Sequence, residues 1–248
     1  MTGSPLLSVV IPVFNAAPLL DALHADICRS LEGLDSYELI FVDDGSGDGS
    51  AATLQRIARK DPAARVLALP RNTGQQEATL TGLALAAGEY CATMDDDGQH
   101  PPGLLPGMLA RLRADGLDIL YAVPEGRRES LMRTVGGIMR DGLFTLLFPH
   151  CGRDVRVSSY RVMTRALALR VLAGRSSFNY FSAMVFQEPT RAAVIPYPFR
   201  PCRTGRSGYS FGKLLALYWK IFRHYGPFGT GRPPLKESPA AREVRGFD

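Results

Sequence analysis

Short apolar runs alternate with longer helical patterns along the first half of the chain. The apolar runs occupy residues 6–14, 38–42, 65–69, 89–94 and 118–123. Such runs predict strands that are buried on both faces. Between them, apolar residues recur at helical spacing over residues 17–32, 51–60, 75–87 and 102–114. Strands and helices joined in turn by short loops predict βαβ units, and hence an α/β fold with a mostly parallel central sheet and helices on both faces.

The second half has a weaker pattern. Apolar residues spaced along 130–148 predict an amphipathic helix, and its flanks and polar positions carry Arg127, Arg128, Arg133 and Arg140. Such a helix lies either against a membrane surface or on an ordinary protein surface, and both interpretations stay open. A strand is predicted over 157–163 and a helix over 210–224. Residues 226–248 are rich in Pro, Gly and charge, which predicts a disordered tail.

Composition sets the broad class. The chain has 248 residues, of which 46% are hydrophobic and 21% are charged. This composition is typical of a soluble protein, and the length leads us to expect a single domain over residues 1–225. Its four cysteines form no CxxC pair, which favours free thiols in a reducing compartment. The first strand begins within a few residues of Met1, so no signal peptide is expected. No uncharged run approaches the roughly 18 residues that cross a bilayer.

Charge is unevenly distributed along the chain. Residues 1–100 contain 6 Lys/Arg and 14 Asp/Glu, whereas the remainder contains 23 basic and 10 acidic residues. An acidic half that binds cations and a basic half that binds anions fit an enzyme that joins a metal-bound nucleotide to a phosphorylated or membrane-associated acceptor. Nucleic-acid binding and simple solvation by arginine are the competing explanations of the basic half.

Three adjacent carboxylates, Asp95, Asp96 and Asp97, follow the strand predicted over 89–94. They repel one another, and Asp is a poor residue in strands and helices, so local stability does not explain them. Ligands of open parallel sheets bind at the carboxyl ends of the strands. Asp95 and Asp97 could reach one ion there, and Gln99 adds a neutral oxygen, a set that suits Mg²⁺ or Mn²⁺ holding a diphosphate. The alternative is a solvated acidic turn before a helix.

A second acidic loop, residues 43–50, follows the strand at 38–42. A calcium-binding EF-hand is excluded because Gln55 stands where the bidentate Glu belongs and a strand precedes the loop. The glycine spacing and position also differ from the dinucleotide-binding fingerprint. The remaining functional interpretation is that Asp43 accepts hydrogen bonds from a nucleotide base or ribose, with Ser50 or Asp48 capping the next helix. Plain turn chemistry is the alternative.

Four motifs then occur in a fixed order: VIPVFN at 10–15, VDDGS at 42–46, RNTGQ at 71–75 and DDDGQHPP at 95–102. In this order they resemble the family 2 glycosyltransferases of the GT-A fold. More narrowly, they resemble the polyprenyl-phosphate glycosyltransferases, which include dolichol-phosphate mannose synthases and bacterial undecaprenyl-phosphate sugar transferases. The resemblance runs from about residue 6 to about residue 220.

The resemblance implies a nucleotide-binding half at 1–123 and an acceptor-binding half at 124–225. It implies nucleotide contacts from Pro12, Phe14, Asn15, Asp43, Gln75, Asp95 and Asp96, and metal ligands at Asp95, Asp97 and Gln99. Ala16 stands where the family usually has Glu, so the nucleotide preference cannot be read from this motif.

The resemblance also implies roles for basic residues of the second half. Arg127 and Arg133 would meet a lipid phosphate. Residues 203–210 resemble the loop that closes over the diphosphate, which would involve Arg203, Arg206, Ser207 and Lys213. Gly208 stands where a lysine often follows the serine, so Arg206 or Lys213 would supply the charge instead.

The charges that develop during sugar transfer favour a phosphate acceptor. Departure of a nucleoside diphosphate develops negative charge, which a metal ion and a basic loop would stabilise. An alcohol acceptor needs a general base, whereas a phosphate is already an anion. We therefore expect metal-dependent, inverting transfer of a sugar to polyprenyl phosphate, with Asp97, Arg127, Arg133 and Arg203 as catalytic residues.

The expected setting is the inner face of the cytoplasmic membrane, with peripheral contact or a membrane partner protein and without a nucleic-acid partner. A soluble glycosyltransferase acting on a saccharide, protein or small molecule is one alternative. A catalytically inactive nucleotide-binding relative is the other, and Ala16 and Gly208 favour it.

Overall fold

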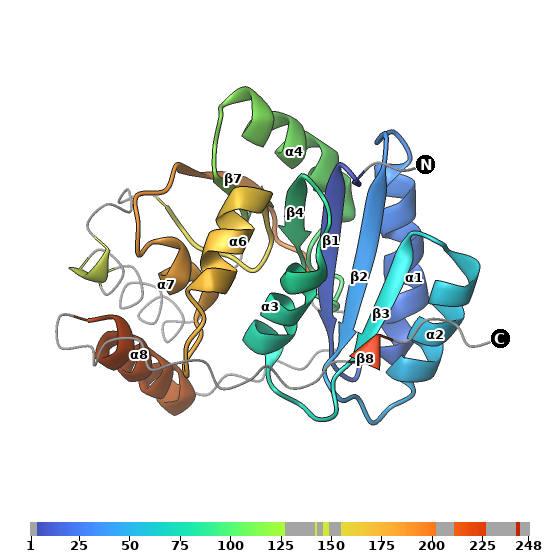
Figure 1. Cartoon of the computed structure of the whole chain (residues 1–248), viewed down its shortest axis with the longest axis horizontal. Helices are drawn as coiled ribbons and strands as arrows, with labels where there is room; N and C mark the ends of the chain where they lie inside the picture. The colour runs from blue at the N-terminus through green and yellow to red at the C-terminus, as the bar shows by residue number, and fades with distance from the viewer. Residues whose placement is uncertain are drawn as a thin grey trace.

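Within the described part of the chain, an eight-stranded sheet in the order β7-β5-β6-β4-β1-β2-β3-β8 forms the centre of the computed structural model (Figure 1). The structure describes residues 4–126, 142, 146–148, 155–201, 211–226 and 242–243, with the backbone alone at 211–215 and 242–243. Strands β3, β2, β1 and β4 are parallel neighbours, and β7 runs parallel to β5. The α/β fold with a mostly parallel sheet is thereby confirmed.

The first half follows the predicted alternation closely. In chain order its elements are β1 (Leu7–Val13), α1 (Ala17–Leu31), β2 (Tyr37–Asp43), α2 (Ser50–Lys60), β3 (Ala64–Ala68), α3 (Gln75–Leu85), β4 (Tyr90–Thr93), the 3-10 turn η1 (Pro102–Leu104), α4 (Leu105–Ala114) and β5 (Ile119–Glu125). Pro12 is the last residue but one of β1, as its missing N–H requires.

The second half differs more from the prediction. Its described elements are β6 (Arg161–Thr164), α6 (Arg165–Ala173), α7 (Phe181–Val185), β7 (Ala192–Pro198), α8 (Phe211–Tyr225) and β8 (Arg242–Glu243). The strand expected over 157–163 begins only at Arg161, and it is antiparallel to both β4 and β5. Helices α6 and α7 and strand β7 were not predicted.

Two other expectations fall largely outside the described residues. Most of the predicted helix at 130–148 lies there, and so does most of the tail at 226–248. Within the tail, Arg242 and Glu243 pair antiparallel with Ala68 and Leu67 of β3. These two residues therefore form a short strand, in contrast to the predicted disorder.

Two apolar layers cover the sheet, one on each face. Helices α1, α2 and α4 pack on the face that receives Val9, Ile11 and Val13 of β1, and α3, α6 and α7 pack on the face that receives Val10 (Figure 1). Because both faces are covered, the central strands read as continuous apolar runs rather than alternating ones.

Among the described helices, none combines the length and the apolarity that crossing a membrane requires.

Candidate active site

The carboxyl ends of β1, β2 and β4 meet at one edge of the sheet and form a pocket of about 260 Å³. Its walls come from the end of β1, the loop after β2, the start of α3 and the loop after β4. The lining residues are Pro12, Val13, Phe14, Asp44, Asn72, Gly74, Gln75, Asp95, Asp96 and Asp97. The structure thus brings five of the seven predicted nucleotide-binding residues into one cavity, together with Asp97.

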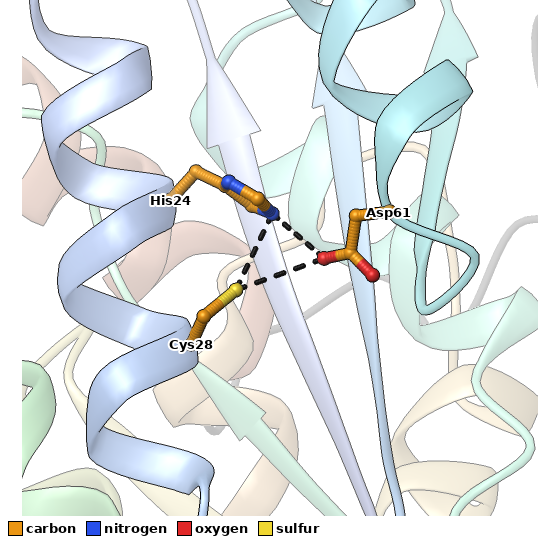
Figure 2. Close-up of side chains that lie close together, drawn as sticks. All are labelled: His24, Cys28 and Asp61. Carbon is orange, nitrogen blue, oxygen red and sulfur yellow. Dashed lines mark hydrogen bonds and ion pairs between the residues drawn. The ribbon is translucent and has the colours of Figure 1, made fainter.

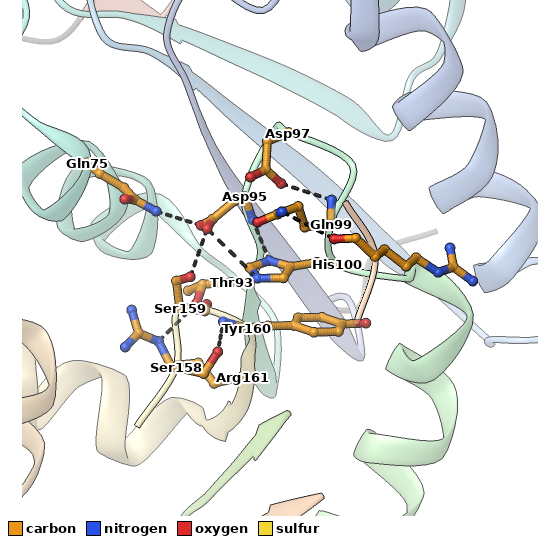
Figure 3. Close-up of polar contacts among 11 residues, drawn as sticks. Gln75, Thr93, Asp95, Asp97, Gln99, His100, Ser158, Ser159, Tyr160 and Arg161 are labelled. Atoms are coloured by element: carbon orange, nitrogen blue, oxygen red, sulfur yellow. Dashed lines mark hydrogen bonds and ion pairs between the residues drawn. The ribbon is translucent and has the colours of Figure 1, made fainter. Parts of the chain in front are cut away.

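The carboxylate of Asp95 is oriented by two side chains from other parts of the chain, and its backbone is held by His100 of the same loop (Figure 3). Its Oδ1 accepts a hydrogen bond from Gln75 Nε2 at 2.5 Å, and its Oδ2 accepts one from Ser159 Oγ at 2.9 Å. Its backbone N–H donates to His100 Nδ1 at 2.9 Å. Pre-oriented carboxylate oxygens are what a cation site in this pocket needs.

Asp96 joins the acidic loop to β1. Its Oδ2 accepts a hydrogen bond from the backbone N–H of Phe14 at 3.0 Å. Burial, and then the negative charges of Asp95 and Asp97, raise the pKa of Asp96 to about 6, against the effect of the Phe14 N–H. The ionised form of this carboxylate is therefore destabilised, and a nearby cation would stabilise it.

Asp97 and Gln99 lie beside Asp95 at the end of β4 (Figure 3). The Asp97 Oδ1 accepts the backbone N–H of Gln99 at 2.9 Å. Burial raises the pKa of Asp97, and the charge of Asp95 adds to this. The side-chain amide of Gln99 donates to the Arg200 carbonyl at 3.2 Å. The three predicted metal ligands thus share one short loop.

His100 was not among the site residues predicted from the sequence, yet its side chain holds the acidic loop in place. Its ring is stacked on Tyr160 with 4.7 Å between the ring centroids, and the Tyr160 hydroxyl donates to the Pro101 carbonyl at 2.6 Å. Because Nδ1 accepts from Asp95, the proton of the neutral ring lies on Nε2, which is 3.8 Å from Asp95 Oδ2.

A buried arginine side chain also lies next to the strand that leads into the acidic loop. Arg161 is 3% exposed, its Nε donates to Thr93 Oγ1 at 2.9 Å, and its guanidinium stacks 3.6 Å above the Phe181 ring. Thr93 Oγ1 in turn donates to the carbonyl of Ser159. Burial lowers the pKa of Arg161 to about 10, so it remains charged at neutral pH. Its positive charge partly balances the carboxylates.

In the loop after β2, the structure separates the roles of two adjacent aspartates. Both side chains are buried, with Asp43 4% and Asp44 2% exposed. The Oδ1 of Asp43 accepts the Ser46 N–H at 3.0 Å, a hydrogen bond within its own loop. Asp44 lines the pocket and accepts hydrogen bonds from the N–H groups of Thr73 and Gly74 and from the Thr73 hydroxyl. Adjacent residues face different ways, which the sequence motif does not reveal.

The same loop is tied to β1 and to the start of α1. Asn15 accepts the Gly47 N–H at 2.9 Å, and its own N–H donates to Ser46 Oγ at 3.0 Å. The residue that caps α2 is Gly49, rather than Ser50 or Asp48 as expected. Asp48 instead accepts the backbone N–H groups of Ser50 and Ala17, which joins the starts of two helices.

Several predicted residues cannot be placed in this site. Arg127, Arg133, Arg203, Arg206 and Ser207 lie outside the described residues. Lys213 lies in α8, of which only the backbone is described at that point.

Comparison with known proteins agrees with this geometry. Residues 8–167 match the family described as Glycosyl transferase family 2. The chain is 32% identical over 222 residues to the undecaprenyl-phosphate 4-deoxy-4-formamido-L-arabinose transferase of Proteus mirabilis (strain HI4320), covering 86% of this chain and 66% of that protein. It therefore spans slightly less than two thirds of the length of this relative.

Two solved structures show the same fold. Glucosyl-3-phosphoglycerate synthase of Mycobacterium tuberculosis, in complex with Mn²⁺, UDP and glucosyl-3-phosphoglycerate, has a TM-score of 0.66 at 20% identity, covering 97% of this chain and 87% of that one. A mannosyltransferase of Pyrobaculum calidifontis, in complex with GDP-Man and Mn²⁺, has a TM-score of 0.66 at 19% identity, covering 94% and 67%. The fold is GT-A, and the chain belongs to glycosyltransferase family 2.

Proposed function

We propose that this chain transfers one sugar, with inversion, from a nucleotide-diphosphate sugar to a polyprenyl phosphate, with Mg²⁺ or Mn²⁺ as cofactor. The observation that carries the donor half is the pocket in which Asp95, Asp96 and Asp97 meet the ends of β1 and β2. The acceptor half is supported by the Proteus mirabilis relative, whose name specifies undecaprenyl phosphate.

The donor set at this loop fits a hard divalent cation. Asp95 and Asp97 supply carboxylate oxygens, and Gln99 supplies an amide oxygen from the same loop. Burial and mutual repulsion raise the pKa values of Asp96 and Asp97, a cost that a bound cation offsets. Once bound, the ion would neutralise the negative charge that develops on the departing diphosphate.

The nucleotide would lie along the end of β1 and the loop after β2. Phe14 is 47% exposed and lines the pocket, so it offers an aromatic face to a base. Asp44 and Gln75 also line the pocket, and the side chain of Gln75 donates a hydrogen bond to Asp95. We keep Asp43 as the proposed base contact and add its neighbour Asp44, a pocket-lining residue that is 2% exposed and accepts three hydrogen bonds from Thr73 and Gly74.

For the acceptor, a phosphate needs no general base, because it is an anion at neutral pH. Arg127 and Arg133 would hold the lipid phosphate near the sugar. Arg203, together with Arg206, Ser207 and Lys213, would close over the diphosphate of the donor. These roles match the excess of basic residues in the second half of the chain.

A membrane contact follows from a lipid acceptor. On α8, Trp219 is 64% exposed and is stacked with Phe222 at a centroid distance of 6.0 Å. Lys220 and Arg223 belong to the same helix. Aromatic and basic side chains together are typical of helices at lipid headgroups, which supports peripheral binding at the inner face of the cytoplasmic membrane.

The test is a transfer assay with the full chain, Mn²⁺ and radiolabelled UDP, GDP and dTDP sugars, using undecaprenyl phosphate in detergent micelles. Transfer predicts label in the organic phase and an equal amount of free nucleoside diphosphate. Undecaprenol, the same lipid without its phosphate, is the matched control and should accept no sugar. Label that enters only water-soluble acceptors would instead favour a soluble glycosyltransferase, and no turnover with any donor would favour an inactive relative.

A further inference from the structure

A second polar cluster lies outside the pocket, between α1 and the end of α2 (Figure 2). His24 and Cys28 lie one turn apart on α1, and Asp61 follows the last residue of α2 (Figure 2). Helix α1 starts near the carboxyl ends of the strands and runs back along the sheet, and Asp61 stands just before β3 begins. None of the three residues is among those that line the pocket around Asp95.

Three ligand atoms converge in this cluster. Nε2 of His24 is 2.7 Å from Oδ2 of Asp61 and 3.4 Å from Sγ of Cys28, and Sγ is 3.6 Å from Oδ2. The side chains of His24 and Asp61 are 19% and 18% exposed, so the cluster is shielded but open to solvent on one side. We propose that His24, Cys28 and Asp61 bind one Zn²⁺ ion, with a water molecule as the fourth ligand.

The spacing of the three atoms supports this assignment. Zinc bonds of about 2.0–2.3 Å in a tetrahedron place neighbouring ligand atoms about 3.3–3.6 Å apart. The two distances to sulfur already agree with this, and the distance from His24 to Asp61 must open by only about 0.6 Å. A histidine and a cysteine four residues apart on a helix share one face, so a single ion reaches both.

The surroundings also hold the ligands in place. The second oxygen of Asp61, Oδ1, accepts the backbone N–H of Ala63 at 2.9 Å, which leaves Oδ2 directed at the cluster. The His24 ring lies against Phe41, with 6.4 Å between centroids. Tyr37 shares a hydrogen bond with Cys28. An ion bound here would cross-link α1 to the connection between α2 and β3.

The chemistry of the donor atoms favours a metal ligand. Without a cation, the Cys28 thiol donates to Oδ2 of Asp61. On binding, the metal replaces that proton, which leaves to solvent, and sulfur bonds as thiolate. Sulfur and imidazole prefer Zn²⁺ to Mg²⁺ or Mn²⁺, so the cluster and the acidic pocket select different ions.

The test uses the full chain, purified under reducing conditions and stripped with a chelator. Excess Mg²⁺ is added to occupy sites made only of oxygen ligands. Co²⁺, a spectroscopic substitute for Zn²⁺, is then titrated in, and Zn²⁺ is used to compete it off. We expect one equivalent of bound Co²⁺ with thiolate-to-cobalt charge-transfer absorption, and complete displacement by Zn²⁺.

Variants assign the signal to this cluster. Cys28→Ser should abolish the charge-transfer absorption, and His24→Ala and Asp61→Asn should each weaken Zn²⁺ affinity by at least about 100-fold. Asp21→Asn, which lies on the same helix but pairs with Arg56, is the matched control and should bind as the wild type does. The double variant Cys151→Ser and Cys202→Ser should also retain the signal.

A second measurement does not depend on the variants folding. Alkylation of Cys28 by iodoacetamide, followed by peptide mass spectrometry, should slow at least tenfold when Zn²⁺ is present. Absence of thiolate absorption in the wild type, or equal alkylation of Cys28 with and without Zn²⁺, would overturn the proposal. The cluster would then be only a set of hydrogen bonds that joins two helices.

Discussion

The backbone N–H of Phe14 donates a hydrogen bond to the carboxylate of Asp96, which joins the end of β1 to the acidic loop after β4. This contact places an exposed aromatic ring and three carboxylates on one pocket. The surface proposed for the base and the surface proposed for the diphosphate are therefore positioned relative to each other before any ligand binds. The first prediction concerns the charge on that carboxylate.

Asp96→Asn should stabilise the protein above pH 6 when no divalent cation is present. The pKa of Asp96 is raised to about 6 in the folded state, so the stability linked to this group is fully present below its unfolded value of 3.8 and is lost as pH rises through about 6. Asparagine cannot ionise, so it avoids that loss. The free energy of unfolding should therefore increase by on the order of 1 kcal/mol, a value that allows for screening of the charge by solvent.

The measurement for Asp96→Asn is urea unfolding of both proteins between pH 4 and pH 8. The difference in unfolding free energy should grow with pH up to about 7 and should shrink when Mn²⁺ is added. A difference that is constant over the whole range would contradict the raised pKa.

Asp97→Asn should lower the rate of sugar transfer by about 10²–10³-fold, because it removes a charged ligand at the site where negative charge develops. It should also abolish the rise in melting temperature that Mn²⁺ and the donor cause together, since a ligand stabilises only the state that binds it. Asp115→Asn at the exposed end of α4, which leaves the pocket unchanged, is the matched control. Full activity of the Asp97 variant would disprove the metal assignment.

Ser159→Ala should weaken Mn²⁺ binding and slow transfer by about tenfold, because Asp95 loses the hydrogen bond that orients its Oδ2. Its effect on unfolding free energy should stay near 1 kcal/mol. Ser158→Ala, whose hydroxyl accepts the Tyr160 N–H instead, is the matched control and should leave Mn²⁺ affinity unchanged. Isothermal titration with Mn²⁺ separates the two variants, and equal effects from both would show that Ser159 acts only through the loop backbone.

Gly45→Ala should destabilise the protein by about 2 kcal/mol or more and weaken donor binding. Gly45 has a φ of +71°, and an added Cβ would lie 2.7 Å from the carbonyl carbon of Arg71. The loop after β2 would then have to move away from the loop before α3, which carries part of the pocket wall.

Gly47→Ala is the control for this position. Among the described residues, no heavy atom beyond its chain neighbours lies within 4 Å of an added Cβ at Gly47. Its unfolding free energy should change by no more than about 0.5 kcal/mol. Urea unfolding midpoints of the two variants make the comparison, and equal midpoints would contradict the close packing of the two loops.

The structure shows why the second half was harder to predict. Strand β7 lies at the edge of the sheet and contains Pro196 and Pro198, residues that argue against a strand when read locally. In the sequence, Ser158 and Ser159 read as a continuation of the strand at residues 160–163. In the structure, the Ser158 hydroxyl instead accepts a hydrogen bond from the Tyr160 N–H, and the Ser159 hydroxyl donates one to Asp95. Side-chain bonds such as these compete with strand pairing.

The sequence by itself determined the features that arise within a short stretch of chain. Alternating apolar runs and helical patterns specify the first five strands and their helices, because both periodicities are local. Asp95, Asp97 and Gln99 fall on one loop at a strand end, so their proximity is also readable from spacing.

Only the tertiary structure decided what lies behind those residues. Arg161 and Ser159 reach the acidic loop because β6 pairs antiparallel with β4, and His24 meets Asp61 because α1 packs against α2. Strand order and helix packing are set by burial summed over the whole core, so no local pattern specifies which distant side chains will share a site.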